Sequence, residues 1–159
     1  MKQQGVTLIQ MLFALAVAML LTQLGMPAYA RLSDDLHRAA AARDLARSLR
    51  SARSHALLQG QAVMVEAVDN DWGKGWRVML RHNRQVLREH RLNRQLTIAD
   101  NLGSQVAFSE QGIPLGRGNG TLEVCERDAP SSQYRVVLAT SGRVSLRTDE
   151  VERSLCAGS

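Results

Sequence analysis

The feature that most constrains this chain is a long uncharged stretch close to its N-terminus. No aspartate, glutamate, lysine or arginine occurs between Lys2 and Arg31, and residues 6–26 read VTLIQMLFALAVAMLLTQLGM. A helix needs about 20 predominantly apolar residues to cross a lipid bilayer. The sequence therefore predicts a membrane-spanning helix at the start of the chain, and the residues beyond it are enough for one folded domain.

Two other interpretations of this stretch remain open. Ala28-Tyr29-Ala30 has the small-x-small form of a signal-peptidase site, which is typical of a cleaved signal peptide. The stretch is longer, however, than the roughly 7–15 apolar residues of such a peptide. The second alternative is a generic single-span membrane anchor.

The start of the apolar stretch carries a more specific signal. The leader MKQQG ends at Gly5, and Val6-Thr7-Leu8-Ile9-Gln10 follows it. This junction resembles the processing site of type IV pilins and type II secretion pseudopilins. The resemblance implies that a prepilin peptidase cleaves after Gly5, that Val6 becomes the N-methylated N-terminus, and that Pro27 stands where pilins often carry a helix-kinking proline.

Gln10 departs from the pattern of that family, which usually has glutamate as the fifth residue after the cleavage point. In pilins this glutamate is thought to pair with the N-terminal amine of a neighbouring subunit. A charge at that depth costs about 2.5–3.5 kcal/mol on insertion scales and needs a partner. Gln10 can hydrogen-bond but offers no ion pair, which fits a rare or terminal subunit. We expect the helix to pack on other subunits through Leu8, Ile9 and Leu12.

The charges around the span predict its orientation, and the orientation bears on the cysteines. Lys2 before an uncharged span favours a cytoplasmic N-terminus and places the following domain in the periplasm, where disulfides persist. The two cysteines of the chain are Cys125 and Cys156. We expect them to form a disulfide worth about 3–4 kcal/mol. The alternative is two unpaired thiols, whereas a zinc site would have too few ligands.

Beyond the span, the sequence predicts one long helix followed by short strands. Helical spacing of leucine and alanine extends the helix over residues 6–60, bent or loosened near Gly25 and Pro27. The expected strands cover residues 62–68, 75–80, 85–91, 106–109, 120–125, 134–139 and 143–146. This order indicates an α+β fold in which a long N-terminal α-helix packs on a β-rich domain of short antiparallel strands. The expected parts are a leader at 1–5, a transmembrane and fibre-core helix at 6–30, an amphipathic helix at 31–60 and a β-rich periplasmic domain at 61–159.

Four short motifs in the predicted domain occur in a suggestive order. They read ARSHA at residues 52–56, WGKGWRV at 72–78, FSEQG at 108–112 and SGRV at 141–144. Together they resemble the GspH/FimT class of minor pilins and pseudopilins. The resemblance implies a two-sheet domain packed on the helix, and a single-pass protein of the inner membrane that enters a pilus or pseudopilus. The implied partners are other major and minor pilins or pseudopilins and the prepilin peptidase, and the choice between a type IV pilus and a type II secretion system stays open.

Single residues of these motifs have structural explanations as well. We expect Trp72, Trp76 and Phe108 to be core or turn-packing residues, and Gly142 to be a turn residue. No catalytic pattern stands out, because the four histidines are scattered and lack the spacing of a metal site. We therefore expect neither enzyme activity nor a cofactor.

Arginine supplies the remaining functional signal. The chain has 20 basic against 15 acidic residues, and some members of the GspH/FimT class bind DNA through a C-terminal G-R-x-R motif. Gly142-Arg143-Val144-Ser145-Leu146-Arg147 matches that motif in part. Strand periodicity would put Arg143 and Arg147 on one face, about 13–14 Å apart. A second basic stretch at residues 81–94 is either a DNA contact or a solvated hairpin. The further DNA-binding candidates are Arg84, Arg88, Arg91 and, more weakly, Arg135 and Lys74.

Overall fold

A computed structural model describes residues 7–127, 131–149 and 153–158 of the chain. Within these residues the one α-helix is α1 (Leu8–Gln59), which continues through Pro27. This agrees with the helix expected at residues 6–60. The chain divides into two compact units, Met1–His37 and Arg38–Ser159, and each is described by itself.

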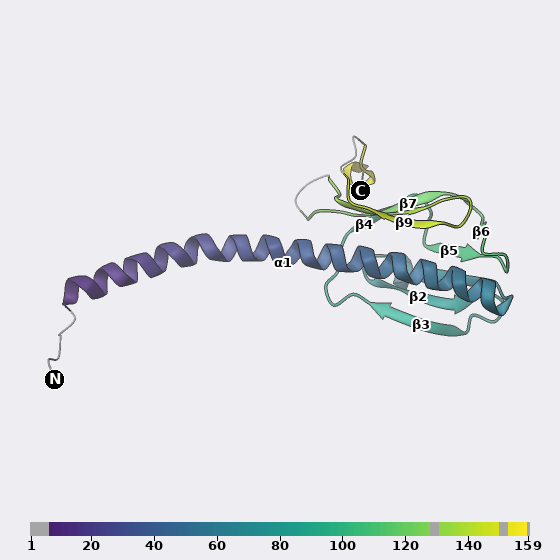
Figure 1. The fold of residues 1–159 in the computed structure, drawn as a ribbon, viewed down its shortest axis with the longest axis horizontal. Helices are drawn as coiled ribbons and strands as arrows, with labels where there is room; N and C mark the ends of the chain where they lie inside the picture. The colour runs from purple at the N-terminus through teal and green to yellow at the C-terminus, as the bar shows by residue number, and fades with distance from the viewer. Residues whose placement is uncertain (1–6, 128–130, 150–152, 159) are drawn as a thin grey trace. The chain divides into compact units, whose positions relative to one another are not determined.

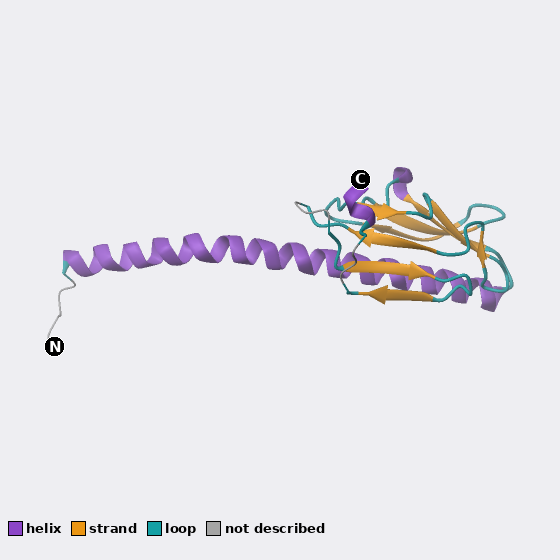
Figure 2. Ribbon diagram, turned by 90° about the horizontal axis from the view of Figure 1, so that it is seen from above, coloured by secondary structure: helices purple, strands orange, loops and turns teal. Residues whose placement is uncertain are grey.

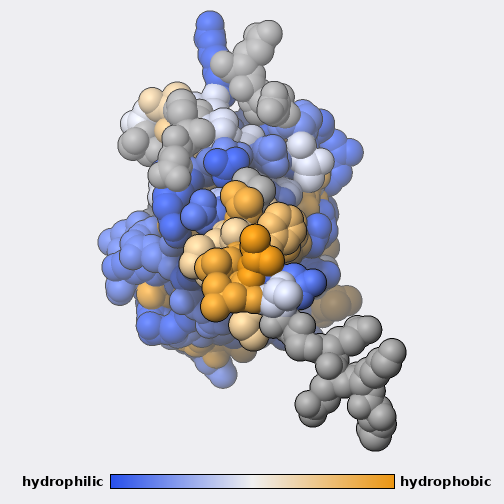
Figure 3. All heavy atoms as spheres, turned by 90° about the vertical axis from the view of Figure 1, so that its left-hand side faces the viewer, coloured by the Kyte–Doolittle hydropathy of each residue, from blue (hydrophilic) through white to orange (hydrophobic). Residues whose placement is uncertain are grey.

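In the described residues, the first unit is the N-terminal part of α1 as far as His37, most of which is apolar. Its large apolar side chains are exposed, with Leu8 78% and Phe13 73% accessible. Seen from the N-terminal end of the helix in Figure 3, hydrophobic residues gather on this part of the surface. By length and composition, this segment can cross a membrane as one helix.

The second unit begins with the amphipathic part of α1. Its buried positions recur at the three- and four-residue spacing of one helix face. They are Ala39, Ala41, Ala42, Leu45, Ala46, Ser48, Leu49, Ala52 and Ala56. This apolar stripe packs on the strands that follow, which is why the helix continues beyond its apolar part.

Two antiparallel sheets complete the second unit (Figures 1 and 2). The first has the strand order β3-β2-β1-β5-β6, with β1 (Val63–Ala67), β2 (Gly75–Leu80), β3 (Val86–Arg91), β5 (Gln105–Phe108) and β6 (Pro114–Leu115). The second has the order β4-β7-β8-β9, with β4 (Ile98–Asp100), β7 (Gly120–Val124), β8 (Tyr134–Leu138) and β9 (Val144–Arg147). The expected fold class is thereby confirmed: the chain is α+β, with a long N-terminal helix on antiparallel sheets.

One hydrophobic core joins α1 to both sheets. Trp76 and Phe108 are completely buried in it. The indole Nε1 of Trp76 donates a hydrogen bond of 2.8 Å to Ser48 Oγ on α1, and that of Trp72 donates one of 3.0 Å to the Gly103 carbonyl. Both tryptophans therefore have their polar atom satisfied inside the protein, as large core residues require. The expectation that Trp72, Trp76 and Phe108 serve packing is confirmed.

The elements absent from the sequence-based expectation are short. They are β4, β6 and two 3₁₀ turns, Val68–Asn70 and Leu155–Gly158. Val68, the last residue of the strand expected at 62–68, belongs instead to the first of these turns. Asp69 and Asn70 adopt left-handed conformations in that turn. The other expected strands are present with ends shifted by one residue or less, and β2 matches its expectation at both ends.

Candidate interaction surfaces

Gln10 makes a hydrogen bond within its own chain at the N-terminus of α1. Its side-chain Oε1 accepts a hydrogen bond of 3.0 Å from the Thr7 backbone N–H, while the amides of Gln10 and Met11 donate to the Thr7 carbonyl. Thr-x-x-Gln is one form of the capping box, in which the fourth side chain reaches back to the first amide. Gln10 therefore caps the helix that carries it. Gly5 and Val6 lie outside the described residues.

The expected assembly residues lie on the exposed surface of the apolar segment. Leu8, Ile9 and Leu12 are 59–78% accessible. Apolar side chains this open to water require lipid or other protein around them. The structure thus places these three side chains where subunit contacts could form.

Arg143 and Arg147 lie at the outer edge of the second sheet. Arg143 ends the turn before β9 and Arg147 ends the strand, and both are exposed while Val144 between them is buried. Asp149 lies near Arg147, because its carboxylate is 2.9 Å from Arg135, the cross-strand partner of Arg147. Its pKa is lowered, first by a hydrogen bond from its own backbone and further by the charges of Arg135 and Arg147. Arg147 therefore shares its surroundings with a carboxylate.

The candidates from residues 74–94 lie on and around β3, an edge strand of the first sheet, and most are paired. Arg84 bonds both carboxylate oxygens of Glu66. Arg91 and Arg77 bond Glu89, and these bonds lower the pKa of the Glu89 carboxyl. Lys74 lies 3.4 Å from Asp69. Within the described residues, Arg88 is exposed and has neither a hydrogen bond nor an ion pair.

The two groups of DNA-binding candidates are not brought onto one sheet. Arg143 and Arg147 belong to the β9 edge, whereas Arg84, Arg88 and Arg91 belong to the β3 edge. Sequence reasoning missed the arginines on the solvent face of α1 as candidates. Arg43, Arg47 and Arg50 are all exposed there, and their spacing of four and three residues is the signal that could have found them.

Arg53 joins α1 to a turn in each sheet. Its Nε donates to the Gly112 carbonyl at 3.0 Å, and its terminal nitrogen donates to the Ser141 carbonyl at 3.1 Å. The two turns have matching geometry, since Gly112 N–H donates to Ser109 O and Gly142 N–H donates to Ala139 O. Both glycines have positive φ. Gly142 is thus the turn residue expected from the sequence.

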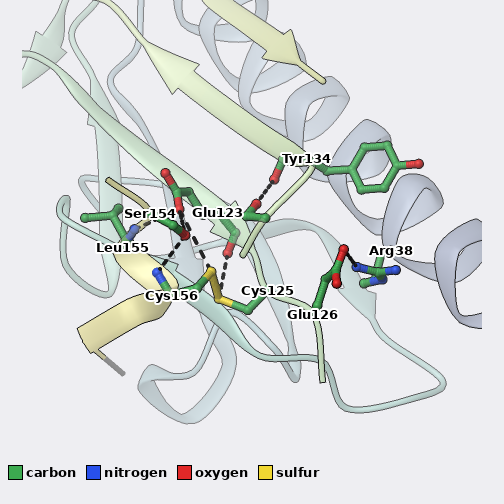
Figure 4. The surroundings of a disulfide bond; sticks show 9 residues. Arg38, Glu123, Cys125, Glu126, Tyr134, Ser154, Leu155 and Cys156 are labelled. Carbon is green, nitrogen blue, oxygen red and sulfur yellow. Dashed lines mark hydrogen bonds and ion pairs between the residues drawn. A yellow bond between two sulfur atoms is a disulfide. The ribbon is translucent and has the colours of Figure 1, made fainter. Parts of the chain in front are cut away.

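The C-terminal segment is fixed to β7 (Figure 4). The disulfide expected from the sequence is present between Cys125 and Cys156. Beside it, Glu123 is 3% exposed, and its carboxylate accepts hydrogen bonds of 2.7 Å from Ser154 Oγ and 2.8 Å from the Leu155 amide. A buried carboxylate needs such partners. The bonds and the disulfide together hold the end of the chain against the second sheet.

Among the described residues, no group of three or more histidine, cysteine, aspartate or glutamate side chains is arranged to hold a metal ion. The functional groups described above are exposed arginines and exposed apolar side chains, and the interpretation that follows concerns these surfaces.

A long helix packed on two antiparallel sheets is the architecture of a solved minor pilin. The chain is similar to two crystal structures of the type IV minor pilin FimU from Pseudomonas aeruginosa, in two space groups. For the first, the TM-score is 0.65 and the identity 22%, over 76% of this chain and 97% of the other. For the second, the TM-score is 0.61 and the identity 24%, over 71% and 96%. At these identities the likeness shows the fold.

The sequence itself defines the family. Residues 41–142 match the family model described as type II transport protein GspH, and the chain belongs to that family. No curated protein sequence matches the chain. Its family and fold are those of minor pilins and pseudopilins.

Proposed function

We propose that this protein is a minor pilin of a type IV pilus, with a role in pilus assembly. Prepilin peptidase cleaves it after Gly5, and Val6 becomes the N-methylated N-terminus. The helix at residues 6–30 anchors it in the inner membrane with the N-terminus in the cytoplasm, and later enters the fibre. Residues 31–60 and the β-rich part at 61–159 face the periplasm.

The observation that carries this proposal is the exposed apolar surface of α1 in a chain of the GspH family. The apolar segment is long enough to span a bilayer. When the protein leaves the membrane and enters a fibre, these side chains need other apolar partners, and neighbouring pilins supply them. Gln10 caps the start of α1 within the chain, as a glutamate at this position also would.

Processing and assembly can be tested together in the native host. Mass spectrometry of the purified protein should show an N-terminus at methylated Val6, and Gly5→Arg should leave the leader attached. Deletion of the gene should reduce the number of surface pili and leave secretion of exoproteins unchanged. Normal piliation in the deletion strain would contradict the proposal.

The alternative is a type II secretion pseudopilin of the GspH class, which the description of the matching family favours. Its partners would be other pseudopilins. The same deletion strain separates the two roles, because loss of exoprotein secretion with normal piliation would establish this alternative.

A second candidate function is DNA capture for natural transformation. The observation that favours it is the exposure of Arg143 and Arg147 at the β9 edge. Binding through phosphate contacts is insensitive to sequence and weakens steeply with salt. A gel shift at two salt concentrations tests it, and the absence of any shift at low salt would refute it.

A further inference from the structure

The strand β3 forms an open edge of the first sheet (Figure 1). Within the described residues it pairs with β2 alone, and all of its side chains except His90 are exposed. Backbone bonding alternates along an antiparallel pair. Because the Leu92 amide just after β3 donates to the Lys74 carbonyl, every second residue from there bonds toward β2. The amides and carbonyls of Glu89 and Arg91 therefore point away from the sheet.

The other three edges of the two sheets are protected. The strand β6 has two residues, and one of them is Pro114, which has no amide hydrogen. The strand β4 has three residues and lies beside the C-terminal turn Leu155–Gly158. On β9, the Val144 carbonyl accepts a hydrogen bond from Arg50 of α1. Short strands, prolines and covering elements are common protections of a sheet edge, and among the described strands β3 is the long edge that lacks them.

The charges around β3 select among the strands that could pair with it. Residues 81–94 contain five arginines and one acidic residue, Glu89. Glu89 is bonded by Arg77 and Arg91, whereas Arg88 is exposed and, as far as the structure describes the chain, has no ion pair or hydrogen bond. A second copy of this edge would bring the same excess of positive charge, and like charges on paired strands are destabilising. A strand with acidic side chains is the complementary partner.

Two features of β3 favour a peptide over a nucleic acid. Val86 and Leu87 at its start are 49% and 39% exposed, which adds apolar surface beside the arginines. Successive side chains of a strand point to opposite faces. A peptide can therefore place its acidic residues on the face of Arg88 and other residues on the face of Glu89, whereas a phosphate backbone has no such alternation.

We propose that β3 binds an extended acidic segment of a partner protein, which adds to the first sheet as a further strand. Main-chain hydrogen bonds to Glu89 and Arg91 supply affinity in this mode of binding, and the side chains opposite Arg88 supply specificity. This inference goes beyond the assembly role proposed above. It depends neither on DNA capture nor on the choice between a pilus and a secretion system.

The test uses the full chain in a non-ionic detergent and a fluorescent peptide, Thr-Val-Glu-Val-Glu-Val-Glu-Thr, as the probe. Glu89→Pro removes an amide that points away from the sheet, where an edge strand tolerates proline. Glu89→Gln is the matched control, because it removes the same charge and keeps the amide. Loss of this negative charge alone should tighten binding of an acidic peptide, so the two variants separate backbone pairing from charge attraction.

We expect Glu89→Pro to raise Kd about tenfold, because it removes a backbone donor, and Glu89→Gln to leave Kd unchanged or lower it. Arg88→Glu should raise Kd by a similar factor, whereas Arg81→Glu, at an exposed residue outside the strand, should stay within about twofold. Two further peptides carry N-methyl groups on alternate sets of amides. One of them should lose binding and the other retain it, because only one set of amides faces β3.

The outcomes that contradict the inference are distinct. Absence of peptide binding at low salt would refute it, and so would equal Kd values for Glu89→Pro and Glu89→Gln. Equal binding of the two methylated peptides would reduce the contact to charge attraction. These peptides are measured on the wild-type chain, so the inference stays testable even if circular dichroism shows that Glu89→Pro does not fold.

Two other occupants of the edge would also be recognised. A wild-type dimer that Glu89→Pro dissociates, measured by analytical ultracentrifugation, would show that β3 pairs with a second copy and would overturn the acidic partner. Binding of a short DNA duplex that Arg88→Glu abolishes and Glu89→Pro leaves intact, together with weaker binding of the peptide, would assign the edge to nucleic acid instead.

Discussion

Removal of the disulfide should cost a large share of the stability of the second unit. Cys125 and Cys156 are 31 residues apart, and closing a loop of that size lowers the entropy of the unfolded chain by an amount worth about 3.7 kcal/mol at 25 °C. A small domain is stable by only about 5–15 kcal/mol. The double variant Cys125→Ala/Cys156→Ala should therefore fold but unfold much more easily than the wild type.

Urea unfolding of a segment from Arg31 to Ser159, followed by circular dichroism, measures this effect. With a slope of about 2 kcal/mol per molar urea, the midpoint should fall by roughly 2 M. The wild type under reducing conditions serves as the control and should unfold near the double variant. A loss below about 1 kcal/mol would refute the reasoning, because it would mean that the unfolded chain is equally restricted without the bond. Glu123→Gln with the disulfide intact tests the adjacent hydrogen bonds separately.

The other expectations concern a turn, the core and one ion pair. A left-handed backbone at a non-glycine residue costs about 1–3 kcal/mol, and Gly142→Ala should destabilise the fold by more than this, because its Cβ would lie 2.2 Å from a carbonyl oxygen of the opposite turn. Gly60→Ala is the control, since Gly60 has positive φ but open space around it. Equal losses of melting temperature in the two variants would contradict this reasoning. Leu49→Ala should cost about 2–5 kcal/mol in chemical unfolding, because Leu49 is completely buried. The Glu89 carboxyl should titrate below 4.5 by NMR, so its contribution to stability is present above about pH 4.5 and is lost as the pH falls through its folded pKa. Arg91→Gln should raise that pKa, and an unchanged value would exclude the hydrogen bond from Arg91 as its main cause.

The parts of the fold that could be predicted are those with a strong local pattern. The helix expected at 6–60 is Leu8–Gln59, and the strand expected at 75–80 is Gly75–Leu80. The strands β4 and β6 have three and two residues, which is too short for an alternating pattern to show. Their existence depends on distant pairing, such as that of Ile98 with Val124.

For the charged surfaces, the sequence shows which arginines are present but not which of them are exposed or paired. The arginines are visible in the sequence, but Glu66 is 18 residues from Arg84, so no local pattern shows that this pair is neutralised. The exposure of Arg43 and Arg47 likewise follows from which side of α1 the sheets cover. The capping role of Gln10, by contrast, is encoded locally as Thr-x-x-Gln.

The arginine bonds at the end of α1 also bear on how the protein carries mechanical load. Arg50 and Arg53 donate to the carbonyls of Gly112 in the β5–β6 turn, Ser141 in the β8–β9 turn and Val144 in β9. Tension along the helix axis would shear these bonds and the buried stripe beside them together, so that rupture requires many contacts to break at once. A force that lifts the helix away from the sheets would instead break them one after another. The second unit is therefore built to resist axial pulling more strongly than peeling.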